Sequence, residues 1–174
     1  MIGLEPLLHL PTVFWDIPEM RKEALALRDS AHIWESEHYT IRGFPTGEQT
    51  PILNNTYDSF LRLYGDCGMV SRSYLYIDKD SDYMWHTDNE ISKTTGNTDK
   101  DVKCAINIVV LGEESSVEFL DYGEYNYIAA LFNTSHLHRI KPVSDRILCK
   151  ISFRDLHFSA NSIAPLKRLE KSPA

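Results

Sequence analysis

The sequence predicts a mainly β protein built as a jelly roll, with supporting helices before it. Apolar residues in the first part of the chain recur every three or four positions, and from Met69 onward short apolar runs alternate with polar turns. Several short strands separated by turns are typical of antiparallel sandwiches and barrels. The 174 residues, of which 43% are hydrophobic, suit a single core. We therefore expect one domain, with helical support at about 1–68, a jelly-roll core at about 69–158 and a frayed C-terminal tail at about 159–174.

Two amphipathic helices are expected in the supporting part. The first spans about 19–36, where Pro18 is a suitable residue for the first helical turn. The stretch 42–47 contains Gly and Pro and indicates a loop. The second helix spans 52–64, because its apolar residues again recur at helical intervals and Gly65 follows it.

Seven short strands are expected in the jelly-roll core. Their ranges are 70–77, 83–87, 102–111, 116–120, 127–132, 138–140 and 146–153. The polar stretch 89–101 follows the second strand and is expected to be a long loop, which is either a lid over a site or a plain solvated connection.

Composition excludes several classes of protein. The net charge of -7 argues against a protein that binds nucleic-acid phosphates electrostatically. Residues 1–6 do not resemble a signal peptide, and no run of about 18 apolar residues occurs, so a cytoplasmic protein without a membrane segment is expected. Cys67, Cys104 and Cys149 are few and widely spaced, which fits neither a disulfide framework nor a structural zinc site.

A group of histidine and carboxylate side chains predicts a metal site. His86 and Asp88 are two positions apart, so on a strand both side chains point to the same face. A histidine from another strand, either His136 or His138, would complete a set of two histidines and one carboxylate. Such a set holds three adjacent positions of an octahedral ion and leaves the others open. Arg146 follows on the next strand, where a cation is able to pair with the far carboxylate of a chelating co-substrate.

These segments resemble the Fe(II)- and 2-oxoglutarate-dependent dioxygenase superfamily. The resemblance covers roughly 70–155 and rests on Met84-Trp85-His86-Thr87-Asp88, on the run from Phe132 to Ile140, and on the strand from Arg146 to Phe153. It implies a double-stranded β-helix, which is a cupin-like jelly roll, and Fe(II) bound by His86, Asp88 and His138. His138 is preferred to His136 because the family's distal histidine commonly precedes a short residue pair before a turn.

The resemblance also implies how 2-oxoglutarate is held. Arg146 is assigned to its far carboxylate, with Arg139 and Arg154 as competitors for the role. A tyrosine before the first metal ligand often assists in this family, which makes Tyr76 the first candidate and Tyr74 the second, although both could equally be core residues. Asn107 is a weaker candidate for an inward-facing polar group. No catalytic residue beyond the metal ligands is expected.

The function implied is that of a hydroxylase. It would use 2-oxoglutarate and dioxygen to oxidise a free amino acid, a protein side chain or another small molecule, and the aspartyl and prolyl hydroxylases are the nearest analogy. The acidic composition disfavours a nucleic-acid substrate. Two other classes stay open. One is a cupin-like metal enzyme that does not use 2-oxoglutarate, from which Arg146 is the distinguishing feature, and the other is a non-catalytic jelly-roll binding module.

Overall fold

Two antiparallel sheets form the body of the protein. The computed structural model describes residues 5–35, 40–45, 47–80, 83–88, 102–113, 115–141 and 144–170. The large sheet has the strand order β1-β8-β5-β10-β4-β3-β2 and the small sheet the order β7-β6-β9. In chain order the strands are β1 (Leu7–His9), β2 (His32–Glu35), β3 (Thr40–Pro45), β4 (Met69–Ile77), β5 (Cys104–Leu111), β6 (Ser115–Phe119), β7 (Gly123–Tyr127), β8 (Ala129–Asn133), β9 (His138–Ile140) and β10 (Arg146–Phe153). This arrangement confirms the mainly β prediction.

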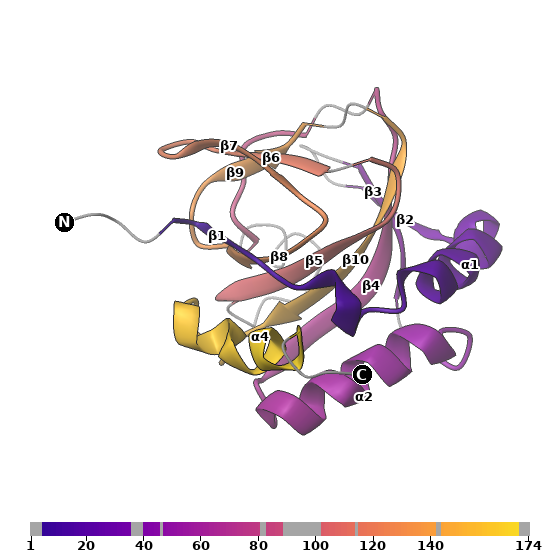
Figure 1. The fold of residues 1–174 in the computed structure, drawn as a ribbon. Helices are drawn as coiled ribbons and strands as arrows, with labels where there is room; N and C mark the ends of the chain where they lie inside the picture. The colour runs from indigo at the N-terminus through magenta and orange to yellow at the C-terminus, as the bar shows by residue number, and fades with distance from the viewer. Residues whose placement is uncertain are drawn as a thin grey trace.

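Helices cover the outer face of the large sheet, while the small sheet lies on its other side (Figure 1). The α-helices are α1 (Ile17–Leu27), α2 (Pro51–Tyr64) and α4 (Ala164–Glu170), and the 3-10 helices are η1 (Thr12–Phe14), η2 (Arg28–Ser30) and η3 (Ala160–Ile163). The Asp16 side chain accepts a hydrogen bond from the Glu19 backbone N–H and caps α1. None of the helices within the described ranges has the length and apolar character needed to span a membrane.

Several features differ from the sequence-based expectation. The first helix ends at Leu27, and β2 and β3 occupy the region expected to be helix end and loop. Strand β1 joins the large sheet beside β8. The strand expected at 83–87 is reduced to a single bridge between His86 and His138. The tail is folded rather than frayed over 160–170, where η3 and α4 form and Ile163 and Leu166 are buried. The expected loop at 89–101 lies outside the described residues.

The strands that the sequence did not predict have a physical reason in common. Short edge strands depend on pairing with a neighbour and carry little pattern of their own. Strand β2, for example, lies at the edge of the large sheet and pairs with β3 over four residues, from His32 opposite Gly43 to Glu35 opposite Thr40. The strand expected at 127–132 is divided between β7 and β8, which belong to different sheets.

Two cores lie on opposite faces of the large sheet. The inner core lies between the sheets and consists of Leu7, Ile77, Val109, Val117, Phe119, Tyr127, Ala130, Phe132 and Leu148. The outer core lies under the helices and includes Met20, Ala24, Leu53, Phe60, Tyr74, Ile106, Ile108, Ile147, Cys149 and Ile151. Side chains alternate along a strand, so the even-numbered residues of β10, including Arg146 and Lys150, share the inner face with Leu148.

Candidate metal centre

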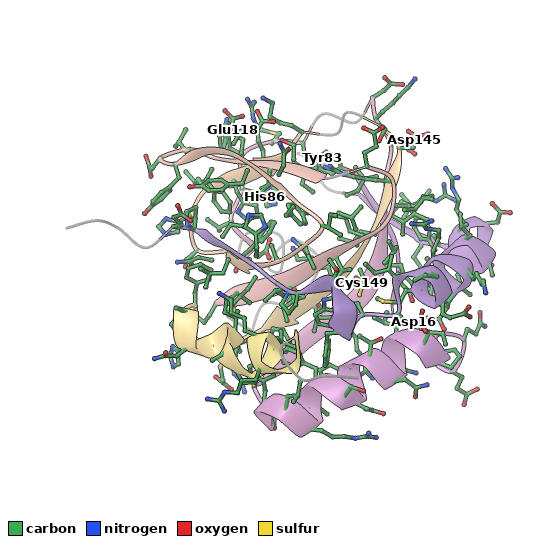
Figure 2. The ribbon with its side chains drawn as sticks, in the orientation of Figure 1. Asp16, Tyr83, His86, Glu118, Asp145 and Cys149 are labelled. Atoms are coloured by element: carbon green, nitrogen blue, oxygen red, sulfur yellow. The ribbon has the colours of Figure 1, made fainter. Side chains whose placement is uncertain are left out.

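His86 and His138 face each other between the two sheets. The backbone N–H of each donates to the carbonyl of the other, and both distances are 3.0 Å. This antiparallel bridge brings the ring centroids to 4.6 Å. The His138 ring packs beside Phe119, at 5.5 Å between centroids. Figure 2 shows His86 inside the molecule, in contrast to Glu118 on the outer side of the small sheet.

The hydrogen bonds of the two imidazoles fix which nitrogen of each ring remains available. His86 Nδ1 lies 2.8 Å from the Met84 carbonyl oxygen, and His138 Nδ1 lies 2.8 Å from the His136 carbonyl oxygen. A carbonyl oxygen only accepts, so each Nδ1 is the protonated donor. Each Nε2 therefore keeps its lone pair, which is the arrangement that a metal-binding histidine needs.

Asp88 completes the group and is 3% exposed. Its Oδ1 lies 3.6 Å from His138 Nε2 and 4.0 Å from His86 Nε2. Its Oδ2 lies 2.8 Å from Lys150 Nζ, a contact with the distance of an ion pair but without the geometry of a hydrogen bond. Burial raises the pKa of Asp88, but the Lys150 ammonium is the largest of the opposing effects, which together hold that pKa well below its usual range. Asp88 is therefore ionised.

The three side chains fit a metal ion of the Fe(II) type. Their ligand atoms all lie within 4.8 Å of one another. Adjacent ligands of an octahedral ion stand about 3 Å apart when the metal–ligand distance is about 2.1 Å, so small movements would close the set. Burial and the neighbouring His138 lower the pKa of His86 to about 4, which keeps it in the neutral, ligating form. Neither oxygen of the buried Asp88 carboxylate has a hydrogen bond in the described structure.

Arg146 is a buried cation that has no hydrogen-bond acceptor among the described residues. It is 3% exposed, and Nε, Nη1 and Nη2 form no hydrogen bond in the described structure. Burial lowers its pKa, and the nearby Tyr127 and Tyr83 oppose that effect. Gly112 makes room for it, because a Cβ there would come within 2.9 Å of Arg146 Cβ. Burying a guanidinium in this state costs on the order of several kcal/mol of folding free energy. Such a group is suited to bind an anion.

The competing arginines and histidine lie elsewhere. Arg139 pairs with Glu118 at 2.7 Å and stacks on Trp85, and Arg154 pairs with Asp155 at the surface. The His136 ring packs against Tyr122, with centroids 5.1 Å apart, and only its backbone carbonyl serves the site. His138 and Arg146, the preferred residues of the sequence analysis, are the ones that the structure brings to the inner face.

The placement of the tyrosines corrects the expectation from the sequence. Tyr76 donates its hydroxyl to the Ala24 carbonyl oxygen at 2.6 Å, and Tyr74 donates to Glu23 Oε1 at 2.7 Å. Both acceptors belong to α1, so both hydroxyls point to the outer face of the large sheet. Neither tyrosine reaches the metal centre or Arg146.

Sequence reasoning missed three residues near the site. Tyr127 and Tyr83 lie near the Arg146 guanidinium, where Tyr76 and Tyr74 were expected. Lys150 touches Asp88, and the signal for it was its position four residues after Arg146 on the same strand face.

Asn107 does face inward, as the weaker expectation had it. It lies opposite Lys150 in the register of β5 and β10 and is 7% exposed, and its Oδ1 has no hydrogen bond in the part of the chain that the structure describes.

Comparison with known structures identifies the fold. A 2OG-Fe(II) oxygenase family oxidoreductase from Burkholderia pseudomallei is 16% identical, with coverage of 90% of this chain and 87% of that one and a TM-score of 0.57. A prolyl-4-hydroxylase from Pseudomonas putida is 12% identical, with 88% and 92% coverage and a TM-score of 0.57. A viral collagen prolyl hydroxylase from Paramecium bursaria Chlorella virus-1 is 10% identical, with 91% and 99% coverage and a TM-score of 0.53.

These similarities confirm the predicted fold class, a double-stranded β-helix with supporting helices. The identities are low, so the similarity concerns the fold alone. No protein-family model matches the sequence, and no curated protein matches it at a significant level.

Proposed function

We propose that this protein is an Fe(II)- and 2-oxoglutarate-dependent oxygenase that hydroxylates its substrate. The metal would be held by His86 Nε2, His138 Nε2 and Asp88 Oδ1, and the far carboxylate of 2-oxoglutarate by Arg146. The observation that carries the proposal is the buried Arg146 guanidinium on the inner face of the large sheet, which has no hydrogen-bond partner among the described residues. A metal site alone would fit many enzymes. A buried cation in addition to the metal favours a ligand with two carboxylates, one to chelate the metal and one to pair with the guanidinium.

The order of residues along β10 supports this assignment. Arg146 and Lys150 are separated by two inward-facing steps of β10, which is about 13 Å between their Cα atoms. Lys150 contacts Asp88 at one end, and Arg146 stands at the other. A five-carbon dicarboxylate that chelates through one end presents its second carboxylate toward the guanidinium.

The chain's own residues orient the reactants and limit water access. Asp88 and the neutral histidines supply three ligand atoms, while Val109, Phe119 and Leu148 of the inner core form apolar walls. Bound iron would supply the redox chemistry that couples oxidative decarboxylation of 2-oxoglutarate to oxidation of a C–H bond. No observation on the described residues favours a cupin-like enzyme without 2-oxoglutarate or a binding module over this proposal.

The substrate class is proposed more broadly. Amino acids, protein side chains and other small molecules remain candidates, and prolyl residues deserve the first trial because two of the similar structures are prolyl hydroxylases. The net charge of -7 disfavours nucleic acid. The cytoplasmic location expected from the sequence is retained as part of the proposal, and three buried free cysteines agree with a reducing compartment.

Turnover of the co-substrate tests the proposal without knowledge of the substrate. The protein, supplied with Fe(II), ascorbate and 2-oxoglutarate in air, is expected to form succinate slowly, and proline-containing peptides are then screened for an increase in that rate. A chelator should abolish succinate formation. Absence of succinate under every condition, together with absence of 2-oxoglutarate binding, would contradict the proposal.

A further inference from the structure

Lys150 is a charged residue in the middle of β10, a strand that also carries the buried Arg146. All other residues of β10 are buried, and the Lys150 side chain is only 20% exposed. Its ammonium lies 2.8 Å from Asp88 Oδ2. Taking a lysine out of water is costly unless it is paired, so this contact accounts for how the strand tolerates the charge. The proposed function gives Lys150 no role.

The two oxygens of Asp88 have different surroundings. Oδ1 faces His138 Nε2 at 3.6 Å and His86 Nε2 at 4.0 Å, whereas Oδ2 faces Lys150 Nζ. A carboxylate binds a metal ion through one oxygen or through both. A cation that already occupies the side of Oδ2 repels a second cation there, so the ion is directed to Oδ1.

The number of protein ligand atoms matters for an octahedral ion. With Asp88 bound through one oxygen, the protein fills three positions and leaves three, which suffice for a chelating co-substrate and dioxygen. With Asp88 bound through both oxygens, only two positions remain, and a chelating co-substrate would fill both.

We propose that Lys150 is a positioning residue that keeps Asp88 monodentate by holding Oδ2, and so preserves the coordination position that dioxygen needs. This inference rests on the proposed function. It concerns the arrangement of ligands rather than the strength of metal binding, and that arrangement can be measured without turnover.

Water relaxation on Mn(II) counts the open positions directly. Mn(II) is loaded into the unmodified protein and into Lys150→Met, which keeps the side-chain length and removes the charge. Paramagnetic relaxation of water protons is then measured before and after 2-oxoglutarate is added. Without 2-oxoglutarate, the contribution of bound water should fall by about one third in Lys150→Met, from three water positions to two. With 2-oxoglutarate, the unmodified protein should retain one bound water and Lys150→Met none.

Two further variants control this experiment. Lys150→Arg keeps a cation beside Oδ2 and should restore the relaxation of the unmodified protein. Lys22→Met removes the same charge from an exposed surface pair with Glu19 and should leave relaxation unchanged. Equal relaxation of Lys150→Met and the unmodified protein in both states would overturn the inference.

A crystal structure of the unmodified protein with Mn(II) decides the matter if Lys150→Met does not fold. The inference predicts one Asp88 oxygen on the ion and the other on Lys150 Nζ, and two Asp88 oxygens on the ion would overturn it. Failure of the unmodified protein to bind Mn(II) would count against the proposed function itself, whereas binding with an unchanged Lys150→Met counts against this inference only.

Discussion

Replacement of Arg146 by methionine should weaken 2-oxoglutarate binding at least about 30-fold while leaving metal binding intact. Removal of one partner of a buried charge pair costs about 2–5 kcal/mol, and 1.36 kcal/mol corresponds to a factor of ten. The 2-oxoglutarate affinity of Arg146→Lys should lie between that of the unmodified protein and that of Arg146→Met, because lysine keeps the charge but loses the bidentate geometry. Calorimetric titration of the Mn(II)-loaded protein with 2-oxoglutarate measures the effect.

The same substitution should stabilise the protein when no co-substrate is bound. The Arg146 guanidinium is buried and forms no hydrogen bond with the residues that the structure describes, so an apolar side chain there should raise the free energy of unfolding by about 1–4 kcal/mol. Tyr76→Phe is the matched control. It removes a buried hydroxyl on the outer face, should lower stability by about 1 kcal/mol and should leave 2-oxoglutarate affinity unchanged. Unchanged co-substrate affinity in Arg146→Met would show that the guanidinium has another role.

Replacement of His138 by alanine should remove metal binding. The substitution deletes one of three ligand atoms, and a loss of more than about 100-fold is expected, because substitution of residues that merely orient ligands already costs about 10- to 100-fold. Binding of an ion at 100 times its dissociation constant stabilises a fold by about 2.7 kcal/mol. The thermal midpoint with and without Co(II) should therefore differ in the unmodified protein and coincide in His138→Ala.

His136→Ala provides the matched comparison. Its ring packs on Tyr122, and the carbonyl oxygen that orients His138 belongs to the backbone and survives the substitution. The Co(II)-dependent rise in thermal midpoint should therefore persist. Loss of the Co(II)-dependent rise in His136→Ala, with its retention in His138→Ala, would identify His136 as the distal ligand instead.

The sequence was sufficient for the long central strands and for the metal group. Strands β4, β5 and β10 have eight or nine residues each, so their alternating or apolar patterns are long enough to indicate strands. The spacing of two residues between His86 and Asp88 was enough to predict that both contribute to one metal site. The ends of the large sheet were not predictable in this way, because β1, β2 and β3 are short and gain their order from neighbouring strands.

The direction of side chains was the harder part of the site. Alternation along β4 groups Tyr74 with Tyr76, but it does not say whether that group points toward the helices or toward the small sheet. Both faces of the strand are covered, so both groups contain apolar residues. Only the position of α1, which supplies Glu23 and the Ala24 carbonyl, settles the direction. The contact between Lys150 and Asp88 likewise depends on two segments that are distant in sequence.

The central claim is that one buried site binds Fe(II) and 2-oxoglutarate together. Anaerobic titration of the Fe(II)-loaded protein with 2-oxoglutarate tests it most directly, because chelation of the ferrous ion by the keto acid produces a weak visible charge-transfer band. The band should appear and saturate at one equivalent in the unmodified protein, be absent in His138→Ala and need far more 2-oxoglutarate in Arg146→Met. Absence of the band in the unmodified protein with Fe(II) bound would contradict the claim.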